Sequence, residues 1–76
     1  MGFEKVQEVI SEVLEIDKDK ISMETLFVEG LGADSIDISQ IINELEEIYE
    51  IEFEATEFAN IRSVADAVEY IKNAMN

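Results

Sequence analysis

Apolar side chains recur at helical spacing in three stretches of the chain. In the first stretch they lie three or four positions apart with glutamates between them, which predicts an amphipathic helix from about Phe3 to Leu14. Apolar residues keep the same spacing from Ile38 to Tyr49 and again from Val64 to Met75. Since residues at this spacing share one face of a helix, each stretch is expected to bury one apolar face.

Start signals precede the second and third of these helices. Asp34 is a good N-cap for the second helix, with Ser35 at its first position and Asp37 at its third. Ser63 is a good N-cap for the third helix, and Asp66 follows three residues later, as in a capping box. No Gly or Pro directly follows the first helix, so the sequence carries no stop signal for its end.

Two links join the three helices, and the first is long for so small a chain. It runs from about Asp17 to Ala33, and long ordered loops are usually functional or anchored by their own side chains. The second link, from Ile51 to Ile61, is expected to contain one short helical turn at residues 56–59. The side chains expected to anchor the first link are Leu26, Phe27, Val28 and Leu31.

Together these elements predict an all-α fold. Three main helices and one short helix would pack into one small core, with the long loop between the first helix and the second. We therefore expect a small, irregular four-helix bundle. No linker or internal repeat divides the chain, so residues 1–76 are expected to form a single domain. A domain of this size buries only about 60% of its unfolded surface, which leaves little room for a deep catalytic cleft.

The charge of the chain restricts its partners. Nineteen acidic residues face five basic ones, for a formal net charge of −14. Five cations cannot neutralise a row of phosphates, and an anionic membrane surface would repel the chain, so neither nucleic acid nor membrane is expected as a partner. The complementary partner is a protein with a basic patch. No secretion signal or membrane-spanning run is visible, so we expect a cytoplasmic protein.

Histidine and cysteine are both absent from the chain. Their absence removes the commonest general base, the Ser-His and Cys-His nucleophile systems, and the usual ligands of zinc. We therefore expect neither an enzyme nor a metal site.

The segment from Leu31 to Asp37 is a glycine-containing loop that runs into a helix start. Ser35 would lie exposed in the first turn, where unsatisfied N–H groups and partial positive charge favour a phosphate. With no base in the chain to activate it, this serine would have to be modified by another protein. By itself an Asp-Ser pair is common, and a polar residue at a helix start is the simpler interpretation.

A longer stretch around Ser35 resembles a known family. Residues 27–37, FVEGLGADSID, closely resemble the prosthetic-group site of bacterial acyl carrier proteins of the type II fatty-acid synthase kind. The end of the second helix, at Leu45-Glu46-Glu47 and Tyr49, and much of the last helix also resemble that family. The alignment runs without gaps from about Leu26 to Ile71.

The resemblance implies a carrier rather than a catalyst. In that family the serine matching Ser35 receives 4′-phosphopantetheine from coenzyme A, through a phosphopantetheinyl transferase that holds Mg²⁺ in its own site. Asp34 matches the motif aspartate and would orient the transferase's metal and the incoming group. The thiol of the arm would carry acyl groups as thioesters, in fatty-acid or related biosynthesis. Expected partners are acyl-transfer, condensing and reducing enzymes with basic docking patches, and the carrier itself is expected to be a monomer.

One face of the second helix is a candidate partner surface. No basic residue lies between Lys20 and Arg62, which leaves the acidic residues of that helix without a cation nearby in sequence. Most runs of charged residues are only a solvated face. Here, however, the acidic residues lie so far from any basic residue that they repel one another, and this favours a role in partner recognition. In the family, partner enzymes bind the matching face. The expected recognition residues are Ile36, Asp37, Gln40, Asn43, Glu46 and Glu47.

Other kinds of carrier remain open. Gln40 and Asn43 depart from the family pattern, so a specialised pathway is an alternative to general fatty-acid synthesis. An aminoacyl, D-alanyl or peptidyl carrier is a second alternative, although Asp34 and Ile36 favour an acyl cargo.

Acidity also suggests a different class, a calcium-binding or unmodified helical adaptor protein. An EF-hand loop beginning at Asp17 fails, because Ser22 replaces the required glycine and Val28 replaces the bidentate glutamate.

The apolar interior raises a further hypothesis. Isoleucine and valine stripes are usually ordinary core, but here they could also part to admit an acyl chain. The side chains concerned are Ile38, Ile41, Ile42, Leu45, Phe58, Ile61, Val68 and Ile71.

Overall fold

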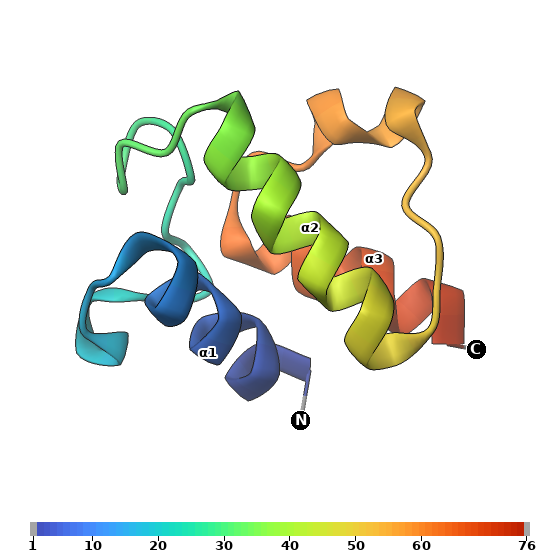
Figure 1. Cartoon of the computed structure of the whole chain (residues 1–76), viewed down its shortest axis with the longest axis horizontal. Coiled ribbons are helices and arrows are strands. Elements are labelled where there is room, and N and C mark those ends of the chain that lie inside the picture. Colours follow the sequence, from blue (N-terminus) through green and yellow to red (C-terminus); the bar gives the residue numbers. More distant parts are fainter. Residues whose placement is uncertain (1, 76) are drawn as a thin grey trace.

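The computed structural model describes residues 2–75, and every named element within that range is a helix. The three α-helices are α1 (Gly2–Leu14), α2 (Ser35–Tyr49) and α3 (Val64–Met75), shown in Figure 1. Two short 3₁₀ helices lie between them, η1 (Lys18–Lys20) and η2 (Ala55–Asn60). The all-α expectation is confirmed, and η2 contains the short turn expected there. The sequence did not predict η1, which lies where only a polar loop was expected.

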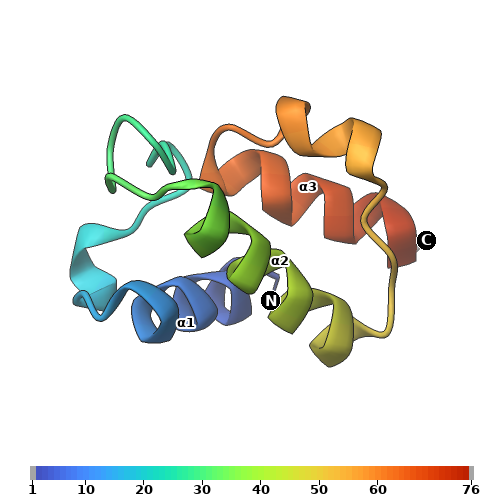
Figure 2. The same ribbon diagram turned by 45° about the horizontal axis from the view of Figure 1, so that its top comes forward.

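The core is formed by the expected apolar faces. α1 packs against both α2 and α3; α2 crosses in front of α3 in Figure 1 and lies between α1 and α3 in the view of Figure 2. Each α-helix contributes side chains that are almost completely removed from solvent, and this burial is the main force that holds the helices together. The buried helical residues are Val6, Val9, Ile10, Ile41, Ile42, Leu45, Val64, Ala67 and Ile71.

Left-handed glutamates end both α1 and α2. Glu15 follows α1 and Glu50 follows α2, each with φ of 55°. After the first of these residues, the backbone N–H of Ile16 donates to the carbonyl of Ser11 over 3.2 Å, which closes the helix end. Glycine is the usual residue at this position, and its absence explains why no stop signal for α1 is visible in the sequence.

Only part of the long loop is anchored as expected. Phe27 is 2% exposed and Leu31 is half-buried, as predicted. Leu26 and Val28 were predicted as anchors and this is wrong, because both are exposed, Val28 to 57%. The backbone takes over their role, since the N–H of Phe27 donates to the carbonyl of Arg62 over 3.0 Å. This bond ties the loop to the segment that leads into α3.

The start of α3 confirms the predicted capping box. The Ser63 hydroxyl accepts from the backbone N–H of Asp66 over 3.2 Å, and an Asp66 carboxylate oxygen accepts from the N–H of Ser63 over 3.1 Å. The same oxygen accepts from the N–H of Arg62 over 3.0 Å. Asp66 therefore fixes the angle at which the chain enters α3.

Candidate functional site

Ser35 is the first residue of α2, and its side chain is exposed. A complete capping box surrounds it; the sequence predicted the N-cap at Asp34 but not the reciprocal bond to Asp37. Oδ1 of Asp34 accepts from the backbone N–H of Asp37 over 2.9 Å, and Oδ2 of Asp37 accepts from the N–H of Asp34 over 3.3 Å. Among residues 2–75 the Ser35 hydroxyl has no hydrogen-bond partner, so it is accessible to solvent and to other proteins.

The loop before Ser35 is held by backbone contacts that require glycine. A Cβ at Gly30 would lie 2.7 Å from the carbonyl oxygen of Leu26, which is too close for any other residue. Gly32 has φ of 69°, in the left-handed region that L side chains avoid. Ala33 is buried, and its N–H donates to the carbonyl of Phe27 over 2.9 Å. The entry into α2 is therefore fixed on one side of Ser35 while the hydroxyl stays accessible.

The chemistry available at Ser35 is that of a tether rather than a nucleophile with its own base. The full chain contains no histidine or cysteine to take the hydroxyl proton. Within residues 2–75, no group of three or more His, Cys, Asp or Glu side chains gathers as a metal site. The exposed N-terminus of a 15-residue helix accommodates a phosphate, because its free N–H groups and partial positive charge favour an anion.

The expected recognition residues divide into two groups in the structure. Ile36, Gln40, Asn43 and Glu47 are exposed along one side of α2, with Ile36 exposed to 71%. Asp37 and Glu46 are half-buried, and each uses a carboxylate oxygen in an internal hydrogen bond.

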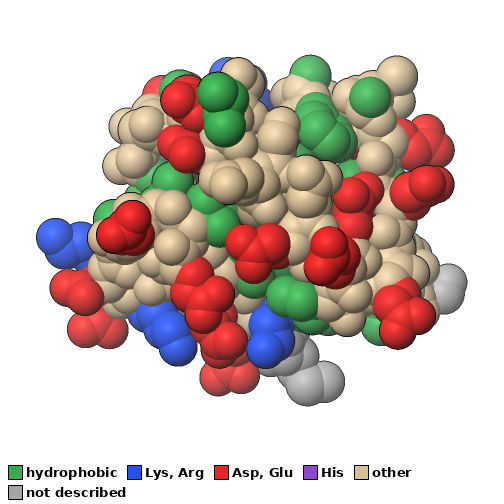
Figure 3. Space-filling model, in the orientation of Figure 1, with side chains coloured by type: hydrophobic (Ala, Val, Ile, Leu, Met, Phe, Trp, Pro, Cys, Tyr) green, Lys and Arg blue, Asp and Glu red, His purple; other side chains and the backbone are tan. Residues whose placement is uncertain are grey.

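Acidic side chains dominate the face of the molecule that α2 occupies in Figure 3. The two salt bridges recorded among the described residues both involve Glu8 of α1, which pairs with Lys5 and Lys18. Within residues 2–75, the acidic side chains of α2 therefore form no salt bridge, and the charge of the exposed ones faces solvent.

A small pocket lies beside the first turn of α2. It has a volume of about 320 Å³ and separates the loop before α2 from η2. Three of the residues proposed to admit an acyl chain line it, namely Ile38, Phe58 and Ile61. Ile38 and Phe58 are half-buried, whereas Ile61 belongs to the buried core.

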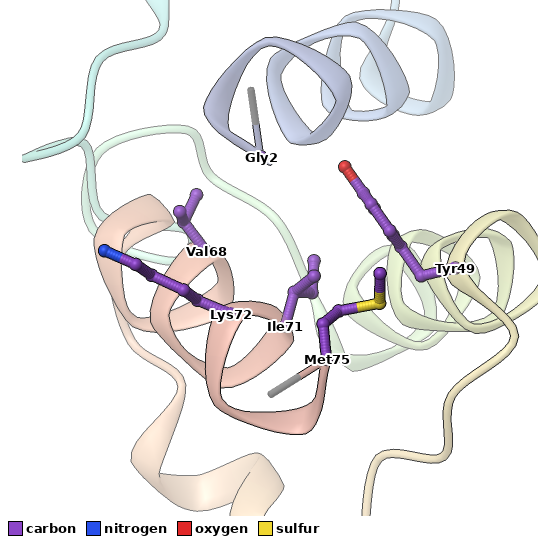
Figure 4. A pocket seen from close by; sticks show the side chains of 6 residues that line it. All are labelled: Gly2, Tyr49, Val68, Ile71, Lys72 and Met75. Carbon is purple, nitrogen blue, oxygen red and sulfur yellow. The ribbon is translucent and has the colours of Figure 1, made fainter.

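A larger pocket, of about 530 Å³, lies at the opposite end of α2 (Figure 4). Tyr49 and residues of α3 line it, and two of these, Val68 and Ile71, are among the side chains proposed from the sequence to admit an acyl chain. It is separated from Ser35 by the length of α2. No helix within residues 2–75 is long and apolar enough to cross a membrane.

Sequence reasoning missed a cluster of contacts that fastens the second link. An oxygen of the Glu46 carboxylate accepts from the backbone N–H of Phe53 over 2.8 Å. The rings of Phe53 and Tyr70 stack, with centroids 4.4 Å apart and an interplanar angle of 16°. No pattern of spacing signals these contacts, because they join residues 7 and 17 positions apart across different elements.

Comparison with known proteins places the site in context. Residues 4–71 match the family described as phosphopantetheine attachment site. The chain is 47% identical over 72 residues to an acyl carrier protein of Clostridium acetobutylicum, covering 95% of this chain and 94% of that protein. It is 42% identical over 69 residues to an acyl carrier protein of Clostridium perfringens, covering 91% of each. An acyl carrier protein of Campylobacter curvus is 40% identical over 70 residues, covering 92% of this chain and 91% of that protein.

Proposed function

This chain belongs to the phosphopantetheine attachment family of acyl carrier proteins, and on that premise we propose that Ser35 is the residue that bears its prosthetic group. As a member of that family it carries acyl groups as thioesters on a covalently bound 4′-phosphopantetheine. The observation that supports Ser35 is its exposed, unpartnered hydroxyl at the first position of α2, inside the matched region.

The proposed attachment is a phosphoryl transfer from coenzyme A. The Ser35 oxygen attacks the phosphorus next to the pantetheine half, and a new phosphodiester bond forms there. The pyrophosphate bond breaks, and adenosine 3′,5′-bisphosphate leaves. A base of the transferase takes the hydroxyl proton, since this chain has no histidine of its own to do so. What α2 supplies is a hydroxyl held at a fixed place and orientation.

Intact mass spectrometry tests the attachment site directly. After incubation with coenzyme A, Mg²⁺ and a phosphopantetheinyl transferase, the wild-type chain is expected to gain the mass of one phosphopantetheine. Ser35→Ala is expected to gain nothing. Ser39→Ala is the matched control, because Ser39 is an exposed serine of the same helix and should leave the mass gain unchanged. A wild-type chain that stays unmodified, or a Ser35→Ala chain that gains mass, contradicts the proposal.

The proposed partner surface is the acidic side of α2. Ile36, Gln40, Asn43 and Glu47 form an exposed row that starts beside Ser35, while Asp37 and Glu46 add charge from its flank. Carrier function implies enzymes that act on the acyl group, and we propose that they dock here through basic patches. This surface brings the partner's active site toward the root of the arm.

Two further parts of the proposal concern the state of the protein. We propose that it acts in the cytoplasm and that it is a monomer. Light scattering at several protein concentrations tests the second point, and a mass of 8.6 kDa is expected throughout.

A further inference from the structure

Three side chains hold the link between α2 and η2 at a single place. We call Glu46 of α2, Phe53 of the link and Tyr70 of α3 the link latch. Glu46 accepts the backbone N–H of Phe53, and Tyr70 stacks on the ring of the same residue. The half-buried position of Glu46 removes part of its carboxylate from water, so the internal bond replaces lost hydration.

The hydroxyl of Tyr70 completes the latch with two backbone bonds. It donates to the carbonyl of Glu52 over 3.2 Å, and it accepts from the N–H of Glu54 over 3.2 Å. The residues on both sides of Phe53 are therefore held by one phenol oxygen. The link is fixed to α2 by Glu46 and to α3 by Tyr70, immediately before η2 begins at Ala55.

The short helix η2, which follows the link latch, contributes little to the core. None of its six residues is buried, and Phe58 is only half-buried. Phe58 packs against the core from this position. After η2, Ile61 enters the core, and the carbonyl of Arg62 accepts from the N–H of Phe27. The position of η2 is therefore held by Phe58 and by its two ends, and the link latch is the end on the α2 side.

Phe58 and Ala59 of η2 form one wall of the pocket beside the first turn of α2, and Ile38 forms part of the opposite wall. We propose that Glu46, Phe53 and Tyr70 are positioning residues, which fix this wall relative to Ser35 and so set the shape of the space that receives the start of the cargo. The proposal rests on the carrier function proposed above. It also gives Glu46, through one carboxylate oxygen, an internal role that its exposed neighbour Glu47 does not have.

Amide hydrogen exchange on the intact, phosphopantetheine-bearing protein tests the positioning role. Glu46→Ala removes the acceptor for Phe53, and Glu47→Ala is the matched control because it removes the same charge from the next residue of α2. We expect Glu46→Ala to speed exchange at residues 53–60 by about tenfold relative to wild type, as for loss of a bond to a charged group. Glu47→Ala is expected to leave those rates unchanged.

Two conservative variants separate the bond from the charge and from general packing. Glu46→Gln keeps a carbonyl oxygen that can accept from Phe53, so it should restore slow exchange at residues 53–60. Tyr70→Phe keeps the ring stack and loses only the hydroxyl, so it should speed exchange at Glu54 and at η2 while α1 stays protected. The link latch is contradicted by equal exchange in Glu46→Ala and Glu47→Ala. It is also contradicted by a uniform rise across α1, α2 and α3, which would mean only global destabilisation.

The cargo provides the functional measurement. The rise in melting temperature on adding a medium-chain acyl thioester is expected to be smaller in Glu46→Ala and Tyr70→Phe than in wild type or Glu47→Ala. An equal rise in all four proteins would overturn the positioning role. The mass gain at Ser35 is expected in wild type and in Tyr70→Phe, whose change lies outside the proposed partner surface, so loss of that gain would instead count against the attachment site, and the two failures can be told apart.

Discussion

At the scale of single residues, the two carboxylate oxygens of Asp34 differ in what they contact. Asp34 caps α2 through Oδ1, whereas its Oδ2 has no hydrogen-bond partner among residues 2–75. One oxygen therefore builds the helix start and the other is available to a visiting protein. This division allows the structural and the functional role of Asp34 to be measured separately.

Asp34→Asn should lose the function and keep the cap. Asn and Asp are equally good N-caps, so the free energy of unfolding is expected to change by no more than a few tenths of a kcal/mol. Without the carboxylate charge, orientation of the transferase's metal is weakened, and kcat/KM for modification of Ser35 should fall by roughly ten- to a hundredfold. Steady-state kinetics followed by intact mass measure the effect. An unchanged kcat/KM would leave Asp34 as a helix cap alone.

At the scale of elements, the starts of α2 and α3 are stabilised by carboxylate charge. α2 and α3 both begin at a reciprocal capping box, and each box places carboxylate charge next to free N–H groups. Asp66 has the more extensive set of bonds, since one oxygen accepts two backbone N–H groups. Its hydrogen bond from the N–H of Arg62 is the largest cause that holds the pKa of Asp66 below its ordinary value of 3.8.

Removal of the Asp66 carboxylate should therefore lower the free energy of unfolding by an amount that depends on pH. Because its pKa is lower in the folded chain than in the unfolded one, the contribution of Asp66 is complete above the unfolded value and is lost as pH falls through the folded value. Asp66→Ala is expected to lower the free energy of unfolding by about 1.5–3 kcal/mol at pH 7, the range for hydrogen bonds to a charged group. The difference from wild type should narrow below pH 3.8. Urea unfolding at several pH values measures it, and a difference that is constant with pH would contradict this account.

The acidic side of α2 should act mainly on the rate of association. Opposite charges on two partners speed their encounter, and salt screens this attraction over about 10 Å at 0.1 M. Glu47→Lys is expected to slow binding to an acyl-transfer enzyme with a basic patch severalfold, and added salt should slow the wild type toward the same rate. Stopped-flow binding gives the rates. Glu12→Lys makes the same charge change on exposed α1 and should have a smaller effect, so equal effects would mean that net charge alone matters.

At the scale of the whole molecule, the carrier combines a thin core with a small pocket next to the tether. The described chain has a radius of gyration of 11.0 Å, and its buried residues come from all three α-helices. The pocket between α2, η2 and the long loop, of about 320 Å³, is large enough for part of an acyl chain. Each methylene that enters it would contribute about 0.8 kcal/mol.

Acylation should consequently stabilise the fold in proportion to the length of chain that is sheltered. We expect bare phosphopantetheine to change the melting temperature little, and a long-chain thioester to raise it by several degrees, since about 1 kcal/mol corresponds to about 4–8 °C in a domain of this size. Differential scanning calorimetry of a chain-length series measures the effect. Equal melting temperatures throughout the series would indicate that the cargo stays exposed.

The sequence by itself determined the features that depend on near neighbours along the chain. Apolar spacing defined the three α-helices, and the residues around Asp34 and Ser63 marked two helix starts, because a capping box joins residues only three positions apart. The same stretch identified Ser35 as the candidate tether.

Only the tertiary structure decided the features that depend on contacts between distant segments. α1 and α2 end on left-handed glutamates, at a position where glycine is usual. In the long loop, Phe27 is buried whereas Val28 is exposed, because a backbone bond to the segment before α3 fixes the loop's orientation there. The link latch joins Tyr70 to a carbonyl 18 residues away. Such contacts form only once the helices pack, so no local pattern records them.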